Sequence, residues 1–297
     1  MDKRLRRHEY GFLELVDPPS EDQLTEYYAQ KYYQSEQSNY RKSYPPEELA
    51  AIQLRINLGA AHADSIRAST KPGRILDVGC GEGFVMAAYE ARGWYVEGID
   101  HSLKGVENMN PDQAAHVTQG NLFSLLEDRV AAGTTYDLVW LGNVLEHVTN
   151  PVDLMHALHA TLKPAGLLVA TVPNDGSTYH EMLLQSGAIP ERFWIAIPDH
   201  LSYFTRASFE TTAKATNWAV RDMQGDFPID LFLSHSASNY VADRAQGPAA
   251  HSARLQLENM IGAAGIDKAN AFYSALAGVG LGRNLTAYLS PNEEAKT

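Results

Sequence analysis

The sequence predicts an α/β protein whose central parallel sheet is covered by helices on both faces. The first observation is the segment Arg74–Phe84, RILDVGCGEGF, in which an apolar run ends in an acid and passes through Gly-x-Gly-x-Gly into apolar residues at helical spacing. This pattern is typical of a buried strand that turns tightly into a helix. The second observation is that short apolar runs and helical segments alternate from there to residue 172, which predicts right-handed crossovers between parallel strands.

Composition excludes several classes of protein and site. The chain has 297 residues and a net charge of −12, and Cys80 is its only cysteine. We therefore expect one catalytic domain with added lids or insertions, no broad nucleic-acid surface, no disulfide within the chain and no cysteine-rich zinc site. We also expect a cytoplasmic protein without membrane insertion, because no long apolar run and no signal-like N-terminus occur. A basic cluster at residues 3–7 is either a solvated tail or a contact for an acidic partner.

Residues 1–70 are predicted to form a tyrosine-rich helical lid. The segment Leu24–Tyr33 has helical spacing, and its tyrosines, Tyr33 among them, either close over a bound ligand or pack a helix onto the domain. The sequence Pro-Pro-Glu-Glu at 45–48 predicts the start of a second helix. We expect this helix to run to about Arg67.

Residues 71–228 carry the alternating elements of the predicted sheet. The expected strands span 75–78, 95–99, 115–118, 136–141, 167–172 and 218–223. The expected helices span 85–92, 103–108, 122–131, 151–162 and 208–215.

Two long segments interrupt this alternation. Residues 174–204 combine glycines and prolines with large apolar side chains, and a segment of this length is typical of a lid or binding loop. Residues 229–283 are predicted to be mostly helical, with breaks near 247–248 and 262–265, and are expected to add substrate contacts or the interface of a homodimer. The last strand and the tail are expected over 284–297.

The turn at 79–83 predicts a nucleoside-like cofactor, because glycines let the backbone approach a ligand and a helix start offers free N–H groups. The dinucleotide pattern requires a glycine where this chain has Phe84, and no Gly-Lys-Ser/Thr follows as in the Walker pattern. Asp100 ends the second strand, where a carboxylate suits the ribose of NAD and of S-adenosylmethionine equally. Asp77 favours S-adenosylmethionine, because its carboxylate orients groups around the methionyl ammonium and sulfonium but repels a pyrophosphate.

Four successive motifs, LDVGCGEG, VEGID, YDLVWLGNVLEHVTNP and LLVATVPN, resemble those of the class I S-adenosylmethionine-dependent methyltransferases, most closely the ubiquinone-biosynthesis-like group, over about residues 45–223. The segments EYYAQKYYQ and ERFWIAIPDHLSYFT are similar to a bacterial subgroup whose genes often lie near polysaccharide genes. The resemblance implies a doubly wound sheet of seven strands. Its last strand is expected to form an antiparallel hairpin with the sixth, here interrupted by residues 229–278.

The residues and the resemblance together predict the cofactor site. The glycines are expected to cradle the methionyl part, Asp100 the ribose, and the loop after the fourth strand the region beneath the sulfonium. Alternatives remain for Asn121, which also suits a helix cap, and for His101, which also suits an exposed loop. The predicted cofactor contacts are Asp77, Gly79, Cys80, Gly81, Gly83, Asp100, His101, Asn121, Leu122, Gly142, Asn143 and Tyr33.

Two histidines are candidates for a general base. His147 follows the fourth strand, where residues face the ligand crevice, and is alternatively a histidine bonded to the loop backbone. His200 lies near the end of the 174–204 segment and is alternatively a loop histidine near a helix start. Glu146, Trp194 and Tyr203 are the predicted substrate contacts. We expect no metal, because the available ligands are few and scattered.

The predicted function is transfer of a methyl group from S-adenosylmethionine to a hydroxyl of a small molecule or glycan, assisted by histidine. An oxygen nucleophile usually needs deprotonation, whereas the cofactor is already activated. An N- or C-methyltransferase acting on an amino sugar, quinone or lipid precursor is the first alternative. A non-catalytic cofactor-binding module is the second, and an NAD-dependent enzyme, disfavoured by Phe84, is the third.

Overall fold

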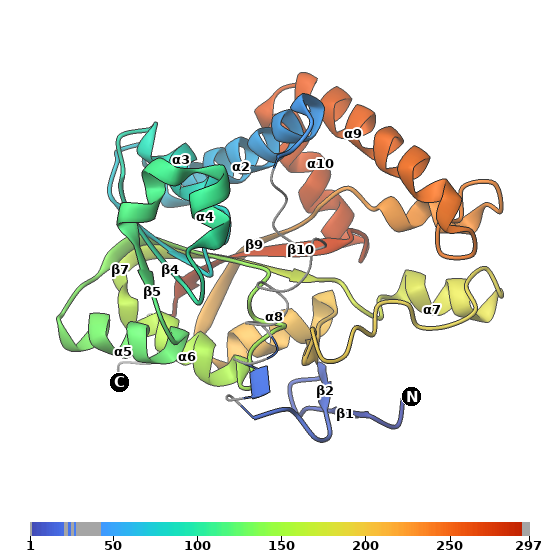
Figure 1. Ribbon diagram of the computed structural model, residues 1–297, viewed down its shortest axis with the longest axis horizontal. Helices are drawn as coiled ribbons and strands as arrows, with labels where there is room; N and C mark the ends of the chain where they lie inside the picture. Colours follow the sequence, from blue (N-terminus) through green and yellow to red (C-terminus); the bar gives the residue numbers. More distant parts are fainter. Residues whose placement is uncertain (1, 21–22, 25–26, 28–42, 293–297) are drawn as a thin grey trace.

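A seven-stranded sheet forms the centre of the protein (Figure 1). The structure, a computed structural model, describes residues 2–20, 23, 24, 27 and 43–292. The strands of this sheet are β3 (Arg74–Val78), β4 (Tyr95–Asp100), β5 (Val117–Gln119), β6 (Tyr136–Gly142), β7 (Leu162–Pro173), β9 (Trp218–Gly225) and β10 (Asn284–Pro291).

The strand order is β5-β4-β3-β6-β7-β10-β9. The first five strands are parallel, and β10 runs antiparallel to both β7 and β9. The prediction of a doubly wound, mainly parallel sheet with an antiparallel last strand is therefore confirmed. The central strands are apolar on both faces because helices cover both, as Ile75, Leu76 and Val78 in β3 show by being fully buried.

Helices cover the two faces of the sheet (Figure 1). One face carries α2 (Pro46–Arg67), α3 (Phe84–Glu90), α4 (Lys104–Met109), α9 (Gly247–Ala263) and α10 (Ile266–Gly278), and the other carries α5 (Leu122–Ala131), α6 (Pro151–Thr161) and α8 (Arg206–Ala215). Each face has its own buried apolar cluster. Among the described residues, no helix is both long enough and apolar enough to cross a membrane.

The N-terminal part differs from the predicted helical lid. Strands β1 (Leu5–Arg7) and β2 (Leu13–Leu15) form an antiparallel hairpin, and β2 also pairs with β8 (Ser202–Tyr203). The prediction of a helix is therefore wrong for residues 5–15. The predicted helix at 24–33 extends beyond the described residues, whereas the second predicted helix is confirmed as α2.

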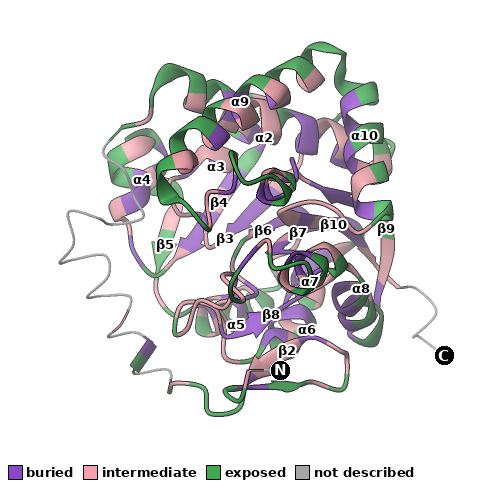
Figure 2. Ribbon diagram, turned by 90° about the vertical axis from the view of Figure 1, so that its right-hand side faces the viewer, coloured by how far each residue is buried: buried purple, intermediate pink, exposed green. Residues whose placement is uncertain are grey.

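Residues 174–204 fold into α7 (Thr178–Gln185), a loop and β8, and they project to the right in Figure 1. Their apolar side chains share one buried cluster with the N-terminal hairpin and with the start of the 229–283 segment. The members of this cluster are Leu5, Leu15, Leu24, Leu183, Ile189, Trp194, Leu201, Tyr203 and Leu233. Figure 2 shows this part as a mixture of buried and exposed segments around α7 and β8.

The segment between β9 and β10 is largely helical, as predicted. It holds two short 3-10 helices (Ile229–Ser234 and Arg244–Gln246) before α9 and α10. An ion pair of 2.9 Å between Arg55 and the buried Glu258 joins α2 to α9. These helices therefore form a cap over the β7-β10-β9 side of the sheet.

Candidate active site

The glycine-rich turn connects β3 to α3 at the carboxyl edge of the sheet. Gly79, Gly81 and Gly83 have φ angles of +70°, +53° and +74°, in the left-handed region that other residues rarely adopt. The backbone N–H of Gly79 donates to the carbonyl oxygen of Ile99 at 2.8 Å. A methyl group on Gly79 would collide with Cγ2 of Val144, so both conformation and space require glycine there.

Asp100 ends β4 and reaches back to the glycine-rich turn. Its Oδ2 accepts a hydrogen bond from the backbone N–H of Gly81 at 2.9 Å, and its Oδ1 accepts one from that of Ser102 at 2.9 Å. Burial raises the pKa of Asp100, and these hydrogen bonds lower it in part. A carboxylate oxygen accepts more than one hydrogen bond, so Asp100 keeps capacity for ribose hydroxyls.

Asp77 is buried in β3 just ahead of the turn. Burial, and then the like charge of Asp100, raises the pKa of Asp77 to about 8. A buried and a partly buried carboxylate at one edge fit a ligand that brings an ammonium, a sulfonium and ribose hydroxyls, and they would repel a polyphosphate. The residues present therefore fit S-adenosylmethionine, which supplies an activated methyl group when bound.

The other predicted cofactor residues lie around the same turn or outside the described chain. Cys80 is buried, and burial raises the pKa of its thiol. His101 is exposed, and Leu122 is buried at the start of α5. The side chain of Asn121 accepts a hydrogen bond of 3.2 Å from the first turn of α5 and therefore caps that helix. Tyr33 lies outside the described residues, and the cofactor contacts of all five stay predictions.

The loop after β6 lies directly against the glycine-rich turn, because Val144 packs on Gly79. It begins at Gly142, and Asn143 then adopts a left-handed φ of +55°. The side-chain amide of Asn143 donates to Glu146 Oε1 at 3.2 Å and lies 3.4 Å from Asn284 Oδ1. Asn143 thereby links the loop to the start of β10.

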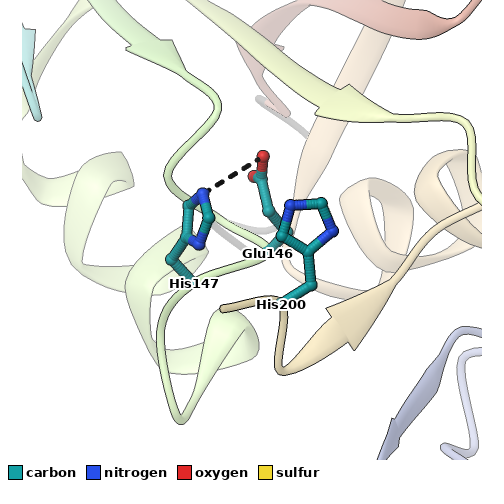
Figure 3. Close-up of side chains that lie close together, drawn as sticks. All are labelled: Glu146, His147 and His200. Atoms are coloured by element: carbon teal, nitrogen blue, oxygen red, sulfur yellow. Dashed lines mark ion pairs between the residues drawn. The ribbon is translucent and has the colours of Figure 1, made fainter. Parts of the chain in front are cut away.

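Glu146, His147 and His200 form a cluster beside this loop (Figure 3). The backbone brings them together, because the N–H groups of Leu201 and Ser202 donate to the carbonyl oxygen of Glu146 at 2.7 and 3.1 Å. One oxygen of Glu146 and one ring nitrogen from each histidine all lie within 4.8 Å of one another. The imidazole centroids are 5.0 Å apart, so the structure brings both candidate bases into one site.

The cluster combines a deeply buried acid with two partly exposed imidazoles. Glu146 is 1% exposed, its Oε2 has no hydrogen-bond partner in the described part of the chain, and burial raises its pKa. Nε2 of His147 lies 3.7 Å from Oε1 of Glu146, and Nδ1 of His147 lies 2.6 Å from the carbonyl oxygen of Asp199. Because a carbonyl oxygen only accepts, this Nδ1 carries the proton. The expectation that possible metal ligands are scattered is therefore wrong for these three residues, while the absence of a metal stays a prediction.

Four residues of the site were missed by sequence reasoning. Asp175 lies two residues after the end of β7 and contacts His200, and Arg283 precedes β10 and contacts Asp175. The hydroxyl of Tyr44 donates to the carboxylate of Glu82 in the glycine-rich turn, at 2.8 and 3.0 Å from its two oxygens. Only Asp175 had a local signal, because it lies close to the carboxyl end of an apolar strand, as Asp100 does.

Trp194 and Tyr203 lie inside the apolar cluster of the 174–204 segment. Trp194 is 3% exposed, and its indole stacks on His180 with 4.5 Å between ring centroids. Tyr203 is buried, and its hydroxyl donates to the carbonyl oxygen of His200 at 2.9 Å. Both side chains thus hold the segment together, and their contact with a substrate stays a prediction.

A cavity of about 280 Å³ opens between the sheet and the cap helices. It extends from Gly142 and Asn143 to side chains of α2, α9 and α10, including Arg55, Glu258 and Tyr273. Aromatic and aliphatic side chains form much of its wall, and these few polar groups converge in it. Such a cavity is typical of a small-molecule site.

Residues 60–222 match a family profile described as a methyltransferase domain, which is more than half of the 297-residue chain. The ubiquinone biosynthesis O-methyltransferase of Aeromonas salmonicida is 27% identical over 155 residues, which cover 51% of this chain and 65% of that protein. The corresponding protein of Psychrobacter cryohalolentis is 27% identical over 192 residues, which cover 61% of this chain and 73% of that protein. The chain thus spans just under two thirds of the Aeromonas relative.

Solved structures show the same fold at low identity. A SAM dependent methyltransferase from Archaeoglobus fulgidus has a TM-score of 0.50 at 16% identity, covering 90% of this chain and 98% of that one. The Burkholderia thailandensis 1,6-didemethyltoxoflavin-N1-methyltransferase has a TM-score of 0.51 at 15% identity, covering 98% and 100%. Because the matched profile contains the glycine-rich turn, Asp100 and the loop after β6, these likenesses agree with the geometry of the site. The chain therefore belongs to the class I S-adenosylmethionine-dependent methyltransferases, and S-adenosylmethionine is its cofactor.

Proposed function

We propose that the protein transfers the methyl group of S-adenosylmethionine to a hydroxyl oxygen of a small molecule or of a sugar in a glycan. The observation that carries this proposal is the pair of imidazoles at 5.0 Å beside the loop after β6. A hydroxyl is a poor nucleophile until it loses its proton, and a histidine within reach supplies the base. The names of the curated relatives, which are O-methyltransferases, also support oxygen as the acceptor.

In this proposal the carboxyl edge of the sheet holds the cofactor. The glycines of the turn and Gly142 bring backbone close to the methionyl part, Asp77 faces its ammonium, and Asp100 accepts hydrogen bonds from the ribose hydroxyls. Asn121, the Leu122 backbone and His101 lie toward the adenine, and Asn143 lies toward the sulfonium. The protein's contribution to the rate is mainly alignment and exclusion of water.

The acceptor is proposed to bind between the loop after β6 and the segments 174–204 and 229–283. The cavity lined by Glu258 and Tyr273 reaches Asn143, and the side chain of Asn143 donates to Glu146 in the cluster that also holds His200. Trp194 and Tyr203 shape it from within the 174–204 segment. These two segments therefore decide the identity of the acceptor, whereas residues 71–142 decide the cofactor.

Methyl transfer from labelled S-adenosylmethionine to a panel of acceptors tests the proposal. The panel contains alkyl catechols, nucleotide-activated sugars, amino sugars and oligosaccharides, and the product is analysed by mass spectrometry and NMR to locate the new methyl group. We expect an O-methyl product whose formation at subsaturating S-adenosylmethionine is slower with Asp100→Ala, a variant expected to bind the cofactor at least about tenfold more weakly. Asp128→Asn, an exposed change on α5, is the matched control.

Each outcome of this assay has a defined meaning. An N-methyl or C-methyl product would replace the oxygen acceptor but keep the enzyme class. Tight binding of S-adenosylmethionine by calorimetry with no product from any acceptor or cell extract would contradict the proposal and favour a cofactor-binding module.

A further inference from the structure

A chain of polar side chains runs from the start of β10 to the imidazole of His200. Nη1 of Arg283 donates to Oδ1 of Asp175 at 2.8 Å, and Nδ1 of His200 lies 3.3 Å from Oδ2 of the same carboxylate. The side chain of Asp175 is 0% exposed, that of His200 is 15% exposed, and that of Arg283 is 27% exposed. Each carboxylate oxygen of Asp175 therefore has one named partner.

We propose that His200 is the base that takes the proton of the acceptor hydroxyl, and that Asp175 and Arg283 are positioning residues that hold it in the required tautomer. This inference rests on the proposed O-methylation. It assigns the base to one of the two histidines and gives a role to a residue at the end of the 229–283 segment.

The tautomer of His200 follows from its partner. A carboxylate without a proton only accepts, so Nδ1 of His200 carries the hydrogen and Nε2 is left with its lone pair. The carboxylate also stabilises the imidazolium that forms when Nε2 takes a proton. His147 has the same tautomer, but its Nδ1 lies 2.6 Å from the carbonyl oxygen of Asp199 and 3.9 Å from a carboxylate oxygen of that residue. The ring of His200 contacts the carboxylate of Asp175 directly, and this contact assigns the base to His200.

The surroundings of His200 agree with this assignment. Burial by itself lowers the pKa of His200, but the hydrogen bond and charge of Asp175, with the charges of Glu146 and Asp199, raise it above its ordinary value. His147 faces the same ring at 5.0 Å between centroids. These groups come from the loop after β6, the segment after β7 and the segment before β8, and Tyr203 is a further titratable neighbour, with 6.1 Å between its ring centroid and that of His200.

The backbone also fixes the position of Arg283. The N–H of Asn174 donates to the carbonyl oxygen of Arg283 at 2.9 Å, and the side-chain amide of Asn174 donates to the carbonyl oxygens of Gly280 and Gly282 at 3.1 and 3.0 Å. Asn174 is 1% exposed. Three hydrogen bonds from one buried residue thus hold the end of the inserted segment against the residue that contacts His200.

The proposed step balances without a further reactant. The acceptor oxygen attacks the methyl carbon while its proton moves to Nε2 of His200. The carbon–sulfur bond breaks with its electron pair left on sulfur, which gives the methyl ether and S-adenosylhomocysteine. The imidazolium beside Asp175 then releases the proton to water.

The first test needs no acceptor. The Cε1–H signal of His200 is followed by NMR against pH in the full-length protein with S-adenosylhomocysteine, and it is assigned by its loss in His200→Gln. We expect the pKa of His200 to fall by about one unit or more in Asp175→Asn. Asp199→Asn, which removes a neighbouring carboxylate without a hydrogen bond to His200, should lower it less.

The second test uses the acceptor identified by methyl transfer. We expect Asp175→Asn to lower kcat about 10- to 100-fold, to leave the KM for S-adenosylmethionine unchanged, and to move the acid limb of the kcat profile to lower pH. Arg283→Lys keeps the charge and should retain more activity than Arg283→Gln. If Asp175→Asn does not fold, the comparison of His200→Gln with His147→Gln decides, since His200→Gln should cost the larger factor in kcat.

Three results would overturn the inference. One is a His200 pKa that is the same in Asp175→Asn and in the unsubstituted protein. Another is a larger loss of kcat in His147→Gln than in His200→Gln. The third is one divalent ion per chain by elemental analysis, whose removal by a chelator abolishes turnover, because the imidazole lone pairs would then bind the ion. Absence of methyl transfer to any acceptor would instead contradict the proposed function. The NMR titration would still report on the contact between Asp175 and His200.

Discussion

Asp77, which is buried, and Asp100, which is partly buried, are carboxylates near the ends of neighbouring strands, and the charge of Asp100 raises the pKa of Asp77. Two ionised groups in such surroundings destabilise the protein when no cation faces them. The same arrangement suits a ligand that brings an ammonium and a sulfonium, as proposed above for the cofactor. Residues that favour the cofactor thus oppose the stability of the cofactor-free protein.

The pH dependence of stability tests this at Asp77. The folded pKa of about 8 lies far above the ordinary value of 3.8, so the native state holds a proton that the unfolded chain releases between these values, and stability falls as pH rises through that range. Asp77→Asn has no such titration, so its free energy of unfolding lacks this fall with pH. Without cofactor, we expect the stability of the variant relative to the unsubstituted protein to rise by roughly 1–3 kcal/mol from pH 6 to pH 9.

Urea unfolding of both proteins at pH 6 and pH 9 measures this change in relative stability. Both pH values lie above the isoelectric point of about 5.3. Calorimetry of the same variant should show S-adenosylmethionine bound about tenfold more weakly or worse. A difference in stability between the two proteins that stays constant with pH would contradict the raised pKa of Asp77.

At the scale of elements, the turn between β3 and α3 is tied to the loop after β6 through Gly79 and Val144. Replacing Gly79 by alanine introduces a side chain at φ +70° and also a collision with Val144. Gly187→Ala is a matched control, because its φ is +73° but nothing lies within 4 Å of the added atom.

We expect Gly187→Ala to lower the free energy of unfolding by about 1–2 kcal/mol, the cost of a left-handed alanine. Gly79→Ala should lower the free energy of unfolding by more than this and should also weaken S-adenosylmethionine binding. The added change Val144→Ala should recover only the part due to the collision. Equal losses in the two glycine variants, measured by urea unfolding, would show that Val144 does not confine the turn.

The long elements were predictable from sequence for a physical reason. Strands such as β3 and β6 are covered on both faces and therefore appear as continuous apolar runs, and α2 begins at a proline that marks its first turn. The strands β1 and β2 have three residues each. So short a strand has no detectable period, and its pairing with β8 depends on residues far away in the chain.

At the scale of the whole molecule, three distant segments share one apolar cluster, in which Leu15 of β2 packs with Leu201 and Tyr203 of the 174–204 segment. The N-terminal hairpin therefore supports the residues that carry His200. Loss of that support should loosen this region and leave the cofactor-binding half of the sheet intact.

Leu15→Ala tests this support by hydrogen exchange. We expect a loss of about 2–5 kcal/mol for the region that contains it, seen as faster exchange in residues 179–203 with unchanged exchange in β3 and β4. Val16→Ala, at a neighbouring side chain that is 49% exposed, is the control. Faster exchange across the entire sheet would show instead that the cluster is not a separate unit.

The candidate site shows how far sequence reasoning reaches. The glycines, Asp77 and Asp100 were predictable because strand, turn and acid are adjacent in the chain. The contact between Asp175 and Arg283 joins residues 108 positions apart. It exists only because β10 inserts between β7 and β9, and no spacing in the sequence indicates which arginine would meet which acid.

The two ends of the segment inserted between β9 and β10 almost touch. A side chain on Gly282 would lie 2.6 Å from the Cα of Gly225, and Asp226 accepts hydrogen bonds from the backbone N–H and the side-chain amide of Asn284, both at 2.7 Å. Because entry and exit are adjacent, the segment returns to the sheet where it leaves it. We therefore expect its helices to tolerate changes in length while the register of β10 against β9 stays the same.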